Sequence, residues 1–298
     1  MRVFVTGASG WIGSASVEEL LGAGHEVVGL ARSDDSAAAL AARGVEVLRG
    51  ELDDLDSLRA GAEQADAVVH LANKHDFADQ AVSNLAERNA VETLTTVLAG
   101  SDRPFVLASG VAGFAFGRPV TEEDASPFSG LDSPRGGAEN LALERVGAGV
   151  RSVAVRFAPT VHGSGDHGFI AVLVAAARER GAVGYVGDGS NRWSAVHRSD
   201  AARLVRFAVE HAPAGSRLHA VAEEGITTRE IAEAIGRGLG LSTVSVAPGD
   251  ATEHLGWIGA FFAMDFSAAS AATRRLAGWE PTGPTLAEDL ASGAYFTG

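Results

Sequence analysis

Met1-Arg-Val-Phe-Val-Thr-Gly-Ala-Ser-Gly-Trp-Ile-Gly13 is the stretch of sequence that predicts the fold. Its apolar run from Val3 to Val5 predicts a buried strand, and the apolar residues after Gly13 recur at helical spacing. A strand, a glycine-rich turn and a helix in this order direct backbone N–H groups and a helix N-terminus toward a phosphate. The stretch therefore predicts a dinucleotide site at the first turn of an α/β domain.

Three glycines in this stretch have separate expected roles. Gly7 permits the tight turn off the strand, Gly10 lets a pyrophosphate approach the backbone, and Gly13 lets the helix pack close to the sheet. A glycine-rich turn in another kind of α/β domain is the alternative, but the flanking strand and helix favour the dinucleotide. The expected cofactor contacts in this stretch are Thr6, Gly7, Ser9, Gly10, Trp11, Ile12 and Gly13.

The composition excludes several classes of protein. The chain has 298 residues, 46% of them hydrophobic, enough for one large α/β domain or for a nucleotide-binding domain with a second lobe. A net charge of −14 without a basic block argues against nucleic acid or a membrane surface as a partner. There is no cysteine, and no apolar segment resembles a signal peptide or a membrane span, so we expect a cytoplasmic protein.

Strands and helices are predicted to alternate through the first half of the chain. This alternation of apolar strands with helices predicts an α/β fold, a Rossmann-type doubly wound parallel sheet over residues 1–157. The pattern changes after Phe157, and we expect residues 158–298 to form a smaller mixed α/β substrate lobe that returns segment 191–212 to the first domain. After the first strand, the strands are expected near residues 26–31, 45–48, 67–72, 105–108 and 152–156.

The end of the second predicted strand indicates which dinucleotide is bound. NAD-selective sites usually have an acidic side chain there, which binds the ribose 2′-hydroxyl. This strand instead ends in Arg32 and Ser33, a pair that suits a 2′-phosphate better. Asp34 and Asp35 come slightly later and could cap the next helix. The residues therefore favour NADP(H) over NAD(H).

These features resemble the extended short-chain dehydrogenase/reductase superfamily, in its NAD(P)-dependent epimerase/dehydratase group. The stretch from Thr6 to Gly13 is similar to its TGxxGxxG fingerprint. The resemblance covers nearly the whole chain. Other segments similar to family motifs are His70-Leu-Ala-Asn73, Arg156-Phe-Ala-Pro159, Val161-His-Gly163, Gly187-Asp-Gly189, Val196-His-Arg-Ser-Asp200 and Gly278-Trp-Glu-Pro281. It implies further cofactor contacts at Asp53 near the adenine, at Leu71, Ala72 and Asn73, and at Pro159 near the nicotinamide.

The catalytic residues depart from the family pattern. Members of the family typically carry Tyr-x-x-x-Lys after the fifth strand, where the tyrosine exchanges a proton and the lysine lowers its pKa. The matching positions here hold Arg135 and Glu139, and the two tyrosines, Tyr185 and Tyr295, lie elsewhere. Ser109 is the hydroxyl residue that follows the fifth predicted strand. The resemblance therefore implies fold and cofactor more directly than mechanism.

Other side chains are candidates for the missing chemistry. Arg135 could stabilise a developing alkoxide, whereas a histidine is better suited to exchange a proton near neutral pH. His162 and His167 follow the sixth predicted strand, whose end should open on the nicotinamide, and His197 lies in a later segment similar to a family motif. Each could equally be a structural histidine. We take Ser109, Arg135, His162 and His197 as catalytic candidates, and His167, Arg192 and Trp193 as substrate contacts. A metal site at residues 162–167 is disfavoured because its ligand set is incomplete.

The leading hypothesis is an NADP(H)-dependent oxidoreductase that transfers a hydride to or from a small carbonyl, imine or enone. A sugar-nucleotide epimerase or dehydratase is an alternative that the missing tyrosine weakens. The loss of both pair residues also leaves open a non-catalytic NADP(H)-binding redox sensor. The resemblance further implies a homodimer formed by helices near residues 76–98 and 134–147.

Overall fold

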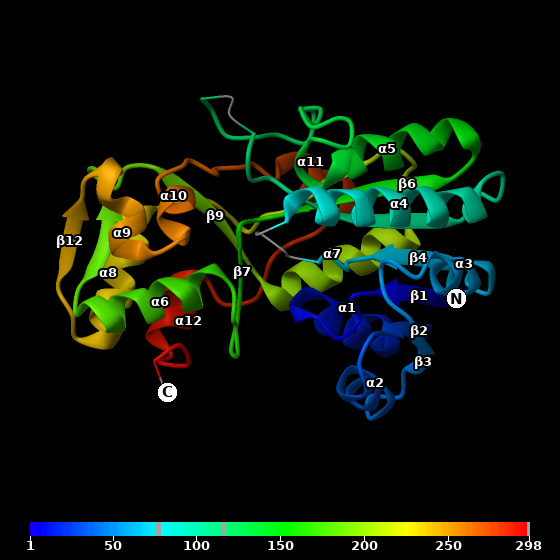
Figure 1. Ribbon diagram of the computed structural model, residues 1–298, viewed down its shortest axis with the longest axis horizontal. Coiled ribbons are helices and arrows are strands. Elements are labelled where there is room, and N and C mark those ends of the chain that lie inside the picture. Colours follow the sequence, from blue (N-terminus) through cyan, green and yellow to red (C-terminus); the bar gives the residue numbers. More distant parts are fainter. Residues whose placement is uncertain (75–78, 115–116, 297–298) are drawn as a thin grey trace.

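A seven-stranded parallel sheet forms the centre of the protein (Figure 1). A computed structural model describes residues 1–74, 79–114 and 117–296. The strand order is β10-β6-β5-β4-β1-β2-β3, and it reverses direction between β1 and β4. The strands are β1 (Arg2–Thr6), β2 (Glu26–Ala31), β3 (Glu46–Arg49), β4 (Ala67–His70), β5 (Pro104–Gly110), β6 (Arg151–Phe157) and β10 (Arg217–Ala220). This doubly wound topology confirms the predicted fold class and places a ligand crevice at the carboxyl ends of β1 and β4.

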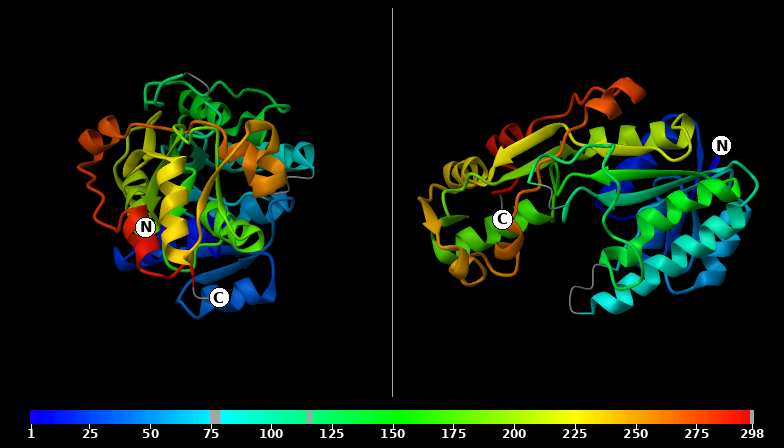
Figure 2. Two further views of the ribbon diagram at one scale, coloured as in Figure 1. Left: turned by 90° about the vertical axis from the view of Figure 1, so that its left-hand side faces the viewer. Right: turned by 90° about the horizontal axis from the view of Figure 1, so that it is seen from above.

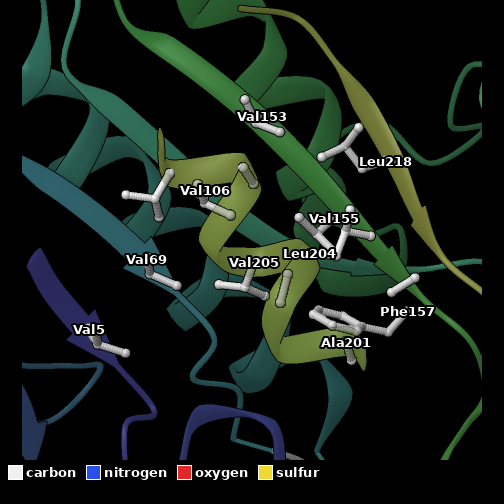
Figure 3. Packing of buried hydrophobic residues seen from close by; sticks show 14 of the residues in the cluster. Val5, Val69, Val106, Val153, Val155, Phe157, Ala201, Leu204, Val205 and Leu218 are labelled. Atoms are coloured by element: carbon white, nitrogen blue, oxygen red, sulfur yellow. The ribbon is translucent and has the colours of Figure 1, made fainter. Parts of the chain in front are cut away.

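Helices cover both faces of this sheet because the side chains of each strand alternate between the faces. Val3 and Val5 pack with α1 and α7, whereas Phe4 between them packs with α3 and α4 on the opposite face. Figure 3 shows Leu204 and Val205 of α7 against the valines of β5 and β6. The covering helices are α1 (Trp11–Gly22), α2 (Asp34–Ala41), α3 (Leu55–Glu63), α4 (Gln80–Leu98), η1 (Pro134–Gly137), α5 (Ala138–Glu144), η2 (Arg145–Ala148) and α7 (Arg198–Glu210).

A smaller unit lies at the carboxyl end of the main sheet (Figures 1 and 2). Its own core is centred on Trp193, which is fully buried and contacts Phe262 and Phe266. Its strands are β7 (Thr160–His162), β8 (Val183–Val186), β9 (Arg192–His197), β11 (Glu223–Thr227) and β12 (Thr243–Val246). Its helices are α6 (Phe169–Arg180), α8 (Thr228–Leu239), η3 (Pro248–Asp250), α9 (Ala251–Leu255), α10 (Ile258–Phe262) and α12 (Leu286–Ala291). We call this unit the lobe.

The chain passes between the main sheet and the lobe more often than the boundary at residue 157 predicts. Within segment 191–212, α7 packs on α1 as expected, but β9 pairs with β7 and β11 in the three-stranded sheet of the lobe. β10 lies outside that segment and pairs with β6 as the last strand of the main sheet, beside α11 (Ala271–Ala277). The expected division therefore misplaces both strands.

Among the described residues, no helix combines the length and the apolar composition that a membrane span requires.

Candidate active site

A cavity of about 1100 Å³ opens between the carboxyl edge of the main sheet and the lobe. The glycine-rich turn, the loops after β2 to β6, and the start of α6 all contribute to its wall. We distinguish two parts of this wall. The β2–β3 end comprises Leu30, Arg32, Ser33, Ser36, Gly50, Glu51, Leu52 and Lys74. The β5–β6 end comprises Ala108, Ser109, Gly110, Arg135, Glu139, Phe157, Ala158 and Pro159.

The glycine-rich turn has the geometry that a pyrophosphate requires. Gly7 has a φ of +68°, and a Cβ added there would lie 2.7 Å from the backbone nitrogen of Ala72. A Cβ on Gly13 would lie 1.9 Å from the carbonyl oxygen of Gly7. Helix α1 begins without a side-chain cap and without an acidic residue in its first turn. Its free N–H groups and its dipole therefore suit an anion, and Ser9, Gly10 and Ile12 line the same cavity.

Trp11 and Thr6, two predicted cofactor contacts beside these glycines, have different surroundings. The Trp11 indole lines the cavity and donates to the carbonyl oxygen of Val161 over 2.7 Å. The Arg198 guanidinium lies 4.3 Å from its ring centre. Thr6 is buried behind the turn, where its hydroxyl contacts His70 Nδ1 at 2.7 Å. Thr6 therefore joins the ends of β1 and β4 and does not line the cavity.

The β2–β3 end contains two cations. Arg32 lines the cavity, and its guanidinium has no polar partner within the described part of the chain. The nearby acid Asp34 is paired with Arg49 at 2.9 Å. Lys74 also lines the cavity and pairs with Asp53 at 2.5 Å. Asp53 itself, expected near the adenine, is absent from the cavity wall, so it would act there through Lys74.

A buried ion pair forms the floor of the β5–β6 end. Ser109 follows β5 and donates to Glu139 Oε2 over 2.6 Å. Arg156 of β6 is fully buried and donates to the same carboxylate through Nε at 3.0 Å and through a terminal nitrogen at 2.5 Å. His219 on β10 contacts Arg156 through Nε2 at 3.3 Å, and burial lowers the pKa of this histidine. The carboxylate at the expected lysine position is thus held by a buried arginine.

Arg135, at the expected tyrosine position, is held by a second ion pair. It donates to the fully buried Glu87 over 2.5 Å, and Glu87 also accepts from the amide of Asn73 at 3.2 Å. Arg135 has a φ of +54°, and Gly136 and Gly137 continue this left-handed conformation. Such a conformation costs a residue with a side chain roughly 1–3 kcal/mol, which the surrounding contacts must offset.

Glu87, the acid that pairs with Arg135, has a buried histidine beside it. His70 Nε2 lies 3.8 Å from Glu87, and burial lowers the pKa of His70. Neutral His70 therefore leaves the negative charge of Glu87 to Arg135. Ser109, Arg135, Glu139 and Asn73 all line the cavity, so the departures from the family motif meet at one place.

Two of the three candidate histidines lie away from the cavity. His162 is fully buried, and its Nδ1 lies 2.6 Å from Asp289 of α12. Thr160 and Val161, the two preceding residues of β7, line the cavity, but His162 does not. His197 caps α7 by accepting from the Ser199 backbone. The structure therefore favours a structural role for His162 and His197 over the predicted catalytic one.

Of the three predicted substrate contacts, one lines the cavity and two do not. His167 lines the cavity, and its ring meets Trp11 edge-on at 5.7 Å. Trp193 is in the core of the lobe. Arg192 is exposed, and its backbone N–H donates to the carboxylate of Asp265. Neither residue lines the cavity. The sequence alone does not identify the apolar residues that line the cavity, although the apolar start of α6 indicates an apolar surface there. They are Ala112, Phe128, Phe169, Ile170, Val172 and Trp257. No three acidic or histidine side chains among the described residues are arranged for a metal ion.

Comparisons with known proteins agree with this geometry. The NAD dependent epimerase/dehydratase family matches residues 3–221. An uncharacterized protein of Schizosaccharomyces pombe is 44% identical over 99% of this chain and 100% of its own. The 2'-dehydrokanamycin reductase of Streptomyces kanamyceticus is 32% identical over 86% of this chain and 72% of its own. A structure of MoeE5 in complex with UDP-glucose and NAD superposes with a TM-score of 0.74 at 26% identity, covering 99% of this chain and 97% of its own. The chain therefore has a Rossmann-type fold and belongs to the NAD-dependent epimerase/dehydratase family of enzymes.

Proposed function

We propose that the protein is an NADP(H)-dependent oxidoreductase that transfers a hydride to or from a small carbonyl, imine or enone substrate. One observation carries this proposal: a single cavity connects the glycine-rich turn to Ser109, Arg135 and the lobe. A dinucleotide bound at the turn and a substrate bound against the lobe would share that space. The 2'-dehydrokanamycin reductase, a relative over most of its length, supports a reductive reaction by its name.

The β2–β3 end supports NADP(H) as the cofactor. A 2′-phosphate needs cationic or hydrogen-bonding partners, and Arg32, Ser33 and Ser36 line this end together. Asp34, which could otherwise bind a 2′-hydroxyl, has its carboxylate paired with Arg49. The pyrophosphate would be held by the turn at Gly10 and the N-terminus of α1.

The β5–β6 end supplies groups for a carbonyl oxygen. The nicotinamide supplies the hydride when bound, and Pro159 lies in the wall near its expected place. The guanidinium of Arg135 is a cation, so we assign it to stabilising negative charge that develops on the substrate oxygen. Glu139 accepts the hydroxyl proton of Ser109, so we assign Ser109 to holding the Glu139 carboxylate in place and not to donating to the substrate oxygen. We assign delivery of the proton to His167, which lies in the part of the cavity wall formed by the lobe.

Oxidation of NADPH by the purified full chain, followed by absorbance against a panel of aldehydes and ketones, tests this function. Arg135→Ala should lower kcat at least tenfold without weakening NADPH binding, because its charge acts on the substrate oxygen. Arg145→Ala, at a half-buried ion-pair arginine after α5, is the matched control. Activity that prefers NADH would overturn the cofactor assignment, and unchanged turnover by Arg135→Ala would overturn its role.

Two alternatives keep specific support. The resemblance to MoeE5 favours a reaction on a nucleotide sugar, which chromatography of UDP-glucose after incubation with the enzyme would detect. Arg135 pairs with Glu87 and Glu139 pairs with Arg156, and this engagement of both side chains within the protein favours a non-catalytic redox sensor. Tight NADPH binding without turnover of any carbonyl, together with recovery of a protein partner, would select that alternative.

We also propose that two chains associate through α4 and α5. These helices pack side by side, and Val82 and Leu85 on α4 are largely exposed. The first residues of the predicted helix, 76–78, lie outside the described residues. Light scattering should give twice the mass of the chain, and a monomer that remains active would contradict this association.

A further inference from the structure

The part of the cavity wall formed by the lobe carries no fixed positive charge among the described residues. Its members are Thr160, Val161, Asp166, His167, Gly168, Phe169, Ile170, Val172 and Trp257. Arginine and lysine side chains occur in the rest of the described wall at Arg32, Lys74 and Arg135. Arg32 and Lys74 lie at the β2–β3 end, and Arg135 is paired with Glu87. Within the described wall, a substrate against the lobe therefore meets no unpaired arginine or lysine.

Aromatic side chains form the centre of this wall. The Phe169 ring lies 5.9 Å from that of Trp257 and 6.2 Å from that of Phe261. Behind it, the buried Trp193 ring lies 5.7 Å away. Phe169 is thus held in place from more than one side, whereas Trp257 is 47% exposed at the edge of the cavity. Rings supported in this way make a preformed apolar surface for a flat ligand.

The charges of the wall disfavour a nucleotide sugar. A diphosphate is usually bound by arginines or lysines in addition to a helix N-terminus, and the wall of the lobe offers the N-terminus of α6 without such a side chain. The wall of the lobe instead contributes Asp166, whose carboxyl accepts hydrogen bonds from Tyr295 at 2.8 Å and from the Gly168 backbone at 2.7 Å. An aromatic ring, in contrast, gains both burial and edge or face contacts on Phe169 and Trp257.

We propose that the substrate is a neutral carbonyl compound bearing an aromatic ring, and that Phe169 and Trp257 bind this ring and determine specificity. The inference rests on the proposed oxidoreductase function and names its substrate class. The carbonyl group would lie toward Ser109 and Arg135, and the ring toward α6 and the start of α10. Trp257 is the residue of choice for a test, because its exposure makes its removal compatible with folding.

The experiment compares NADPH oxidation with cinnamaldehyde and with glycolaldehyde, and follows the conversion of UDP-glucose separately by chromatography, because a nucleotide sugar has no free carbonyl group for NADPH to reduce. We expect kcat/KM for cinnamaldehyde to exceed that for glycolaldehyde at least tenfold, with UDP-glucose unconverted. Trp257→Ala should lower kcat/KM for cinnamaldehyde about tenfold and that for glycolaldehyde less than about twofold, since a ring contact of this kind contributes about one factor of ten. Trp257→Phe should restore most of the loss.

A matched control and a binding measurement keep the outcomes separate. Met264→Ala removes an exposed apolar side chain of the lobe that does not line the cavity, so its selectivity should equal that of the parent. Cinnamamide should inhibit competitively with cinnamaldehyde, with a raised inhibition constant in Trp257→Ala. Preference for glycolaldehyde, conversion of UDP-glucose, or an equal loss for both aldehydes would overturn the aromatic specificity alone. Failure of every carbonyl despite NADPH binding would overturn the oxidoreductase function itself.

Discussion

The two ends of the cavity use charge in opposite ways. At the β2–β3 end, Arg32 has no polar partner within the described residues and Lys74 is held by one exposed acid. At the β5–β6 end, Arg135 and Glu139 are each tied into an ion pair with a buried partner. The first arrangement leaves charge for a ligand, and the second fixes side chains in place. The difference indicates that the β2–β3 end keeps charge available for binding a cofactor. At the β5–β6 end, catalysis would depend on how a substrate contacts side chains that ion pairs already hold in place.

The largest expected effect comes from breaking the network at Glu139. Glu139→Ala leaves Arg156 buried without its carboxylate partner, which should lower the free energy of unfolding by about 3–5 kcal/mol. Urea denaturation measures the change. Glu144→Ala, at the exposed end of the same helix, should change stability by less than about 0.5 kcal/mol. A loss below about 1 kcal/mol for Glu139→Ala would mean that Arg156 is satisfied by other groups.

The second-largest effect is expected from a change in the backbone of the glycine-rich turn. Gly13→Ala places a methyl group within 1.9 Å of the Gly7 carbonyl oxygen, so the turn must move. We expect NADPH affinity to fall by about a hundredfold or more, equivalent to about 2.7 kcal/mol. Gly22→Ala, at the end of the same helix with nothing within 4 Å of the added methyl, should bind normally. Quenching of tryptophan fluorescence by NADPH gives both affinities, and equal values would refute a pyrophosphate at this turn.

A smaller, selective effect is expected at Arg32. Arg32→Ala should weaken NADPH binding by about 1.5–3 kcal/mol, the usual contribution of a hydrogen bond to a charged group, and should leave NADH binding unchanged. The same titration with both dinucleotides measures the difference. Arg43→Ala, another exposed arginine near the end of α2, serves as the comparison. Equal losses for the two cofactors would show that Arg32 does not contact a 2′-phosphate.

The smallest effect concerns two buried histidines beside the ion pairs of the β5–β6 end. Burial lowers the pKa of His70 and His219 below the ordinary value of 6.5, so the folded state binds fewer protons than the unfolded state. Their stabilising contribution is complete above about pH 6.5 and is lost as the pH falls toward the lower folded values. Unfolding in urea at pH 7.0 and 6.0 should differ by about 1 kcal/mol. Equal stabilities, or a gain on acidification, would contradict neutral histidines at these sites.

The fold and the cofactor turn could be predicted because their constraints are local. The spacing of Gly7, Gly10 and Gly13 reports the backbone geometry directly, and the alternation of strands and helices reports the sheet. The family assignment followed from motifs in the same order along the chain and is confirmed by the match over residues 3–221.

The side-chain directions in the lobe could not be predicted in the same way. β7 has three residues and β9 has six, and a one-residue change of phase exchanges their faces. His162 and Trp193 were therefore assigned to the cavity although both are in the protein core. Phe169 and Trp257 come together only through the folded lobe. The burial of Glu87 beneath Arg135 likewise depends on packing between α4 and η1.

The late position of β10 in the chain has a consequence for synthesis on the ribosome. Between Phe157 and Arg217 lie 59 residues, which take roughly 3–12 s to translate at about 5–20 residues per second. During that interval the outer edge of β6 has its backbone groups unpaired, and such an edge can pair with another chain. The edge is closed when β10, the last strand of the main sheet to be synthesised, pairs with β6.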